Sequence, residues 1–182
     1  NPDFNKNSSQ QKPVLPSNIS VLVHFGRSGT GLLHSLIDGH PAISTLPSIY
    51  LSEYFDHTTW ERIIEGGWNE IIDRFMAIYD VLFDASSVTP IGTQSKTLLY
   101  NIGSKEGMLN VGEQKDEVLS VNKTLFRSEL NYLMAFYDEL DPFILFHLVQ
   151  AAYDKAIGDR SPKSLIFYHI HNPDIHAKLN FI

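Results

Sequence analysis

Cysteine is missing from all 182 positions of the sequence, and basic residues are scarce. Without thiols the chain has no disulfide framework, no thiolate zinc site and no cysteine nucleophile. The 14 lysines and arginines are outnumbered by 21 aspartates and glutamates, which gives a net charge of -7, and they form no cluster. General affinity for nucleic acid depends on such clusters and is excluded. Any anion that this protein binds must therefore be held by a local site.

Long apolar runs are missing as well. No stretch approaches the roughly 20 residues of a transmembrane helix, and the polar residues 1–11 do not contain the apolar core of a signal peptide. We therefore expect a soluble protein, and the missing cysteines are compatible with a reducing, cytoplasmic compartment. The 43% of hydrophobic residues suffices for one buried core in a single domain.

The chain divides into a polar start and one domain. Residues 1–18 are predicted to be a tail or linker, because Asn, Ser, Gln and Pro dominate there without apolar periodicity. The domain is predicted to cover residues 19–182. Residues 19–25 are apolar on both faces and rich in β-branched side chains, which is typical of a buried parallel strand. Residues 164–171 have the same character and predict a second strand.

Helical patterns fill the space between these two strands. Apolar side chains recur at helical spacing in residues 60–83 and 117–137, with a break in the first stretch at Gly66 and Gly67. Asp141 followed by proline predicts the start of another helix, which extends to residue 156. The order strand, helices, strand indicates an α/β fold with a parallel sheet flanked by helices.

A glycine-rich loop joins the first strand to a leucine-rich helix. Its sequence is Gly26-Arg27-Ser28-Gly29-Thr30-Gly31, followed by Leu32. At such a junction the backbone amides and the positive end of the helix dipole converge on an anion. Arg27 adds a planar fork of donors that matches phosphate or sulfate oxygens, and two hydroxyls add further donors. The loop has every chemical group that a phosphate-binding site needs.

Two common nucleotide-binding loops fit this segment less well. A Walker A loop requires a lysine after its glycines, whereas Leu32 follows Gly31. A dinucleotide-binding loop can use the spacing of Gly26, Gly29 and Gly31, and Glu53 lies where a ribose-binding acid would follow. That acid should end a second strand, and residues 48–55 do not have a strand pattern. An NAD(P)-binding oxidoreductase therefore remains as an alternative.

Residues 27–41 resemble the donor-binding segment of the sulfotransferase family, and the likeness continues to Pro47. Members carry Arg or Lys, then Ser-Gly-Thr, a leucine-rich helix and a His-Pro pair, which is His40-Pro41 here. Gly31 departs from the family, where Thr or Ser is common. The resemblance implies a three-layer, P-loop-NTPase-like α/β fold and a site for the 5'-phosphosulfate of 3'-phosphoadenosine 5'-phosphosulfate (PAPS) at residues 26–32. It implies no metal.

The resemblance also implies a reaction and a catalytic base. A sulfuryl group would pass from PAPS to a hydroxyl or amine of a small-molecule or glycan acceptor, leaving 3'-phosphoadenosine 5'-phosphate (PAP). His171 stands in His171-Asn172-Pro173, which is similar to the His-x-Pro of cytosolic sulfotransferases, although His169 replaces their lysine. Glu53 is the second candidate, because an acidic base follows the loop helix in other branches of the family.

One donor element of the family has no counterpart up to Ile182. Sulfotransferases hold the 3'-phosphate with an arginine that ends a strand before Asp-Pro or Glu-Pro, and Arg160-Ser161-Pro162 imitates this only loosely. The resemblance thus covers the first half to two thirds of a family domain. We expect these 182 residues alone to bind PAPS weakly, and a non-catalytic nucleotide-binding fragment is a further alternative.

Overall fold

A computed structural model describes residues 12–24, 28–46, 51, 54–84, 113–114 and 116–171, with the backbone only for His24 and residues 169–171. In chain order the elements are β1 (Asn18–His24), α1 (Thr30–Ile37), β2 (Ile43–Thr45), α2 (His57–Ile64), η2 (Trp68–Glu70), α3 (Ile71–Ile78), η3 (Asp80–Leu82), α4 (Lys123–Met134), α5 (Pro142–Ala156) and β3 (Leu165–His171). In this part of the chain no helix combines the length and apolar character that a bilayer span requires.

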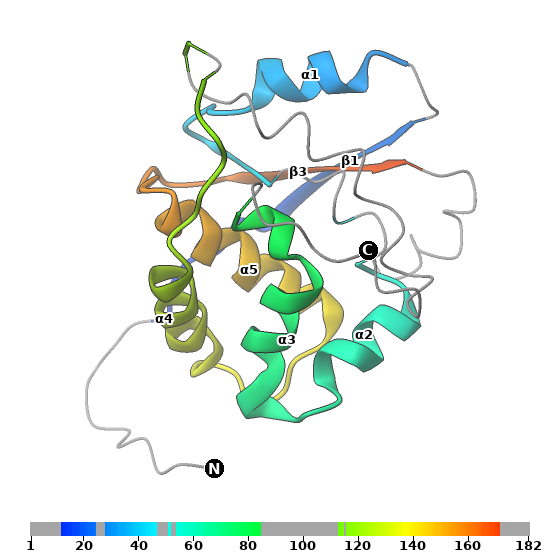
Figure 1. Ribbon diagram of the computed structural model, residues 1–182, viewed down its shortest axis with the longest axis vertical. Coiled ribbons are helices and arrows are strands. Elements are labelled where there is room, and N and C mark those ends of the chain that lie inside the picture. Colours follow the sequence, from blue (N-terminus) through cyan, green and yellow to red (C-terminus); the bar gives the residue numbers. More distant parts are fainter. Residues whose placement is uncertain are drawn as a thin grey trace.

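The strands form a parallel sheet in the order β1-β3-β2. In Figure 1, α1 covers one face of this sheet and α2 to α5 lie on the opposite face. The predicted α/β class with a parallel sheet flanked by helices is therefore confirmed. Since β3 pairs with both other strands, the last element in the chain order completes the sheet.

The two predicted strands form, but they differ in burial. In β3, Ile166, Phe167 and Tyr168 are buried, as expected for a central strand. The same prediction is wrong for β1, because none of its described side chains is buried and Val23 is 45% exposed. The physical reason is position, since β1 pairs only with β3 among the described strands and therefore lies at an edge of the sheet.

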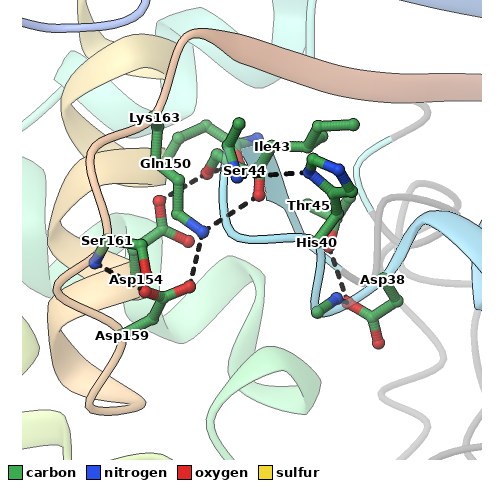
Figure 2. A network of polar contacts seen from close by, with 12 residues as sticks. Asp38, His40, Ile43, Ser44, Thr45, Gln150, Asp154, Asp159, Ser161 and Lys163 are labelled. Atoms are coloured by element: carbon green, nitrogen blue, oxygen red, sulfur yellow. Dashed lines mark hydrogen bonds and ion pairs between the residues drawn. The ribbon is translucent and has the colours of Figure 1, made fainter.

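The sequence pattern did not predict β2, because three residues are too few to show a period. Side chains distant in sequence hold this strand in place (Figure 2). Ser44 of β2 lies 2.7 Å from Asp154 and 3.2 Å from Gln150, both on α5. Thr45 donates a hydrogen bond of 2.7 Å to Asp38, which follows α1. Polar contacts thus attach β2 to the helices on both sides of the sheet.

An aromatic core lies between the sheet and the helices α2 to α5. Tyr54 is at its centre, with ring centroids of Phe75 and Phe146 at 6.3 and 5.6 Å. Phe83 and Phe126 extend the cluster at 4.7 Å from each other. Buried aromatic side chains at these distances contribute both apolar area and favourable edge-to-face geometry. The predicted helical stripe of residues 60–83 is therefore core, as expected.

Some helix boundaries differ from the predicted ones, because a glycine or a capping residue, and not the apolar periodicity, determines where these helices begin or end. The stripe of residues 60–83 is divided at Gly67, whose φ of 74° suits glycine, and it begins earlier than predicted, at His57. The helix predicted for residues 117–137 does not include residues 117–122. Helix α4 starts only at Lys123, because Asn122 caps it by accepting a hydrogen bond from the amide of Leu125.

Helix α5 matches its prediction from Pro142 to Ala156. Its cap is Asp141, whose carboxylate accepts a 2.6 Å hydrogen bond from the amide of Ile144. Gly158, at φ 87°, follows the helix and ends it.

Candidate functional site

Strands β1 and β3 end at the same edge of the sheet. Strands β1 and β3 are parallel and in register, so that His24 pairs with His171 where both strands end. In open α/β sheets, ligands bind beyond the carboxyl ends of the strands. The glycine loop follows β1, and the candidate base His171 ends β3. The backbone therefore brings two sequence-distant parts of the predicted site to the same edge.

A left-handed glycine starts the helix that follows β1. Gly29 has φ 78° and ψ 10° and is the N-cap of α1. Its carbonyl accepts hydrogen bonds of 3.1 and 3.2 Å from the amides of Leu32 and Leu33. The amide of Gly31 precedes these first helical hydrogen bonds, so the helix itself does not satisfy it. The first turn contains no acidic residue.

The space beside the two described glycines of the loop is open. A Cβ atom built on Gly29 or Gly31 meets no other atom within 4 Å. Gly29 needs glycine for its positive φ. Gly31 lies in the first turn of α1, and the space beside it would also admit a side chain.

The described loop residues are accessible to solvent. Ser28, Gly29 and Gly31 are exposed, and Thr30 is half-buried. Leu32, which we included in the predicted site, is 68% exposed and contributes its amide rather than its side chain to the turn. A ligand in solution can thus reach this turn without a conformational change.

Helix α1 rests on the sheet through a narrow stripe. Thr30, His34 and Ile37 are its half-buried residues, one turn apart, whereas its leucines are exposed, with Leu36 at 75%. The ring of His34 lies 5.9 Å from that of Phe167 in β3. Desolvation by this burial lowers the pKa of His34 below 6.5, and attraction to Asp38 offsets the effect only in part. His34 therefore packs helix α1 against the sheet.

The second half of the family-like segment forms a tight turn between α1 and β2. The amide of Gly39, at φ 75°, donates to the carboxylate of Asp38 at 3.1 Å. His40 accepts a 3.2 Å hydrogen bond on Nδ1 from the amide of Ala42, and its carbonyl accepts one from Ile43. His40 is therefore a turn residue. These hydrogen bonds fix the course of the backbone between α1 and β2.

Several predicted site residues lie outside the described part of the chain. These are Gly26, Arg27 and Glu53, and the side chain of His171 belongs with them. Ser28, Gly29, Thr30, Gly31 and Leu32 are described and form the turn at the start of α1. The assignments of the arginine and of both candidate bases therefore remain predictions from the sequence.

His24 was not among the predicted site residues. This residue ends β1 immediately before the glycine loop, and its backbone is the register partner of His171. A signal was present, since a histidine closes an otherwise apolar run next to the loop. Its backbone lies beside that of His171 at this edge of the sheet.

A second polar cluster lies away from this edge, between β2 and α5. Figure 2 shows Ser44 between Gln150 and Asp154, with Lys163 directed toward Ile43 and Asp159. Ser44 is 1% exposed and Asp154 is 6% exposed. Burial raises the pKa of Asp154 to about 6, and the hydrogen bond from Ser44 and the charge of Lys163 oppose that rise. Substrate cannot reach these groups, so the cluster is structural.

No metal site is formed by the residues that the structure describes, because they contain no group of three or more His, Asp or Glu side chains able to hold an ion.

Comparisons of the chain with protein-family models, with curated protein sequences and with solved structures found no match. The function must therefore be argued from the residues and their geometry.

Proposed function

We propose that the protein is a sulfotransferase that binds the 5'-phosphosulfate end of PAPS at the turn between β1 and α1. The observation that carries the proposal is the geometry of this turn. It is exposed, it starts at a left-handed Gly29, and it borders open space at Gly31. The amide of Gly31 precedes the first helical hydrogen bonds, at the helix end where amides bind anions.

The residue types around this geometry favour a sulfonated nucleotide over ATP. A lysine-dependent phosphate loop is excluded by the sequence after Gly31. Arg27 instead supplies the fixed positive charge, and Ser28 and Thr30 supply hydroxyls next to the amides. The likeness of residues 27–41 to the donor segment of sulfotransferases supports PAPS as the specific anion.

The reaction is an in-line displacement at sulfur. The acceptor oxygen or nitrogen forms a bond to sulfur while the bond from sulfur to the bridging oxygen breaks, and PAP leaves with the electron pair. Arg27 and the amides stabilise the charge that develops on the bridging oxygen. The acceptor proton passes to His171, which ends the strand adjacent to β1, or to Glu53.

A ligand panel tests the proposal at the level of binding. Thermal unfolding is followed with PAPS, PAP, ATP and NADP, each at about 5 mM. A Kd near 1 mM then stabilises the fold by about 1 kcal/mol, which raises Tm by a few degrees. We expect PAPS to give the largest increase and NADP the smallest. The Arg27→Ala variant is expected to abolish the increase.

Arg160→Ala is the matched control. This arginine is exposed and precedes β3, so it lies at the amino edge of the sheet, opposite the turn. The control removes the same charge and should leave the PAPS effect unchanged. If NADP stabilises the protein and PAPS does not, the protein binds a dinucleotide and the sulfotransferase proposal is wrong.

A further inference from the structure

A cleft lies on the side of the helical layer away from the sheet. It is bounded by the end of α2, the start of α3 and the connection from α4 to α5, all at the lower edge of Figure 1. Its volume is about 350 Å³, at the lower end of the range for small-molecule sites. The lining residues that matter here are Ile64, Trp68, Ile71, Leu140, Asp138 and Glu139.

One wall of the cleft is apolar and accessible. Ile71 is almost fully buried and forms part of the core, whereas Trp68 and Ile64 are each 38% exposed. A tryptophan ring exposed in a concave site is a large apolar surface that a ligand can cover. Covering it removes apolar area from water at roughly 25 cal/mol per Å². The wall therefore suits a ligand with an aromatic or alkyl body.

Two acidic residues, Asp138 and Glu139, also line the cleft. Asp138 and Glu139 are exposed, and within the described ranges neither forms an ion pair within 4 Å. No lysine, arginine or histidine is among the described lining residues. Two carboxylates beside an indole ring attract a cation both by charge and through the ring face. Next to the cleft, the ammonium of Lys12 already lies 3.9 Å above the ring of Tyr137.

We propose that this cleft binds a small organic cation, an ammonium or guanidinium group carried on an apolar body. The body packs on Trp68 and Ile64, and the cation faces Asp138 and Glu139. The argument is independent of the proposed sulfotransferase activity. The cleft and the turn after β1 lie on opposite sides of the helical layer, so one site can fail its test without affecting the other.

Tryptophan fluorescence tests the proposal directly. The sequence has two tryptophans, so a Trp60→Phe background leaves Trp68 as the reporter. The probe is 2-phenylethylammonium, and 2-phenylethanol and 3-phenylpropionate are its neutral and anionic counterparts. We expect the cation to change the emission of Trp68 with a Kd about tenfold lower than that of the alcohol, and the anion not to bind.

Two double variants distinguish an effect of the carboxylates in the cleft from an effect of the protein's net charge. Asp138→Asn combined with Glu139→Gln should raise the Kd of the cation about fivefold or more. The control combines Asp116→Asn with Glu117→Gln. These two acidic residues are consecutive in sequence, exposed and outside the cleft, so removing the same number of charges there should leave the Kd unchanged. Both double variants are first compared by thermal unfolding to establish that they fold equally well.

Four results would overturn the proposal. These are no change in emission at about 10 mM cation, equal affinity for the alcohol, and equal weakening by the two double variants. The fourth is tighter binding of an acetylated and amidated Phe-Lys peptide than of the free amine, which would assign the cleft to a protein partner.

Discussion

Ser44 has one hydroxyl hydrogen and two acceptors within reach, Asp154 at 2.7 Å and Gln150 at 3.2 Å. When Asp154 is ionised, Ser44 donates to it and the amide oxygen of Gln150 loses that donor. When Asp154 is protonated, its carboxyl group donates to Ser44, which then donates to Gln150. The protonated form therefore gives a donor to both Ser44 and the amide oxygen of Gln150, in agreement with the raised pKa of this buried acid.

The raised pKa predicts how stability depends on pH. Burial moves the pKa of Asp154 from 3.8 to about 6, so the folded state binds the proton more tightly than the unfolded state. This contribution is fully present below pH 4 and is lost as pH rises to 6, by up to about 3 kcal/mol. Asp154→Asn removes the titration and retains an acceptor for Ser44. Urea unfolding should show the variant gaining stability over the parent between pH 4 and 6.

Asp159 in the same network is a control of opposite sign. The hydrogen bond from Lys163 holds the pKa of Asp159 below 3.8, so its contribution is present above that pH and is lost in acid. Asp159→Asn should therefore destabilise the protein at neutral pH and approach the parent toward pH 3. If Asp154→Asn follows this second profile instead, the assignment of the buried proton is wrong.

Among the elements, those with long periodic patterns and local caps were predictable. Helix α5 and strand β3 match their predictions within one residue, because the cap at Asp141 is local and the strand is a continuous apolar run. Strand β2 was not predictable, since Ser44 and Thr45 are held by side chains remote in sequence. Helix α1 was predicted as a helix, but its periodicity could not say that the leucines would face solvent.

The cap of α5 yields a prediction at the same scale. Asp141→Ala removes the acceptor for the amide of Ile144 and should lower the free energy of unfolding by about 1 kcal/mol, measured by urea denaturation at pH 7. Asp141→Asn retains a side-chain oxygen that caps equally well and should stay within a few tenths of a kcal/mol of the parent. Equal losses in both variants would show that the charge, and not the cap, is responsible.

For the whole molecule, the sequence predicted the α/β class with a parallel sheet better than it predicted the packing. A glycine loop between a strand and a helix, and a histidine at the end of a second strand, lie at one edge of the sheet once the strands are parallel. The edge position of β1 could not be predicted, because strand order depends on contacts between residues 18–24 and 165–171. The cleft at Trp68 could not be predicted either, because it forms only where two helical pairs meet.

The binding of PAPS at the turn after β1 is tested most directly by amide chemical shifts. In a ¹⁵N-labelled sample titrated with PAPS, the amides of Gly29, Thr30 and Gly31 should show the largest shift changes, and these should saturate together. The amides at Trp68 and Asp138, in the distant cleft, should not move. If the three loop amides are unchanged at saturating PAPS, or if the changes concentrate elsewhere, the donor site is not at this turn and the proposed function is wrong.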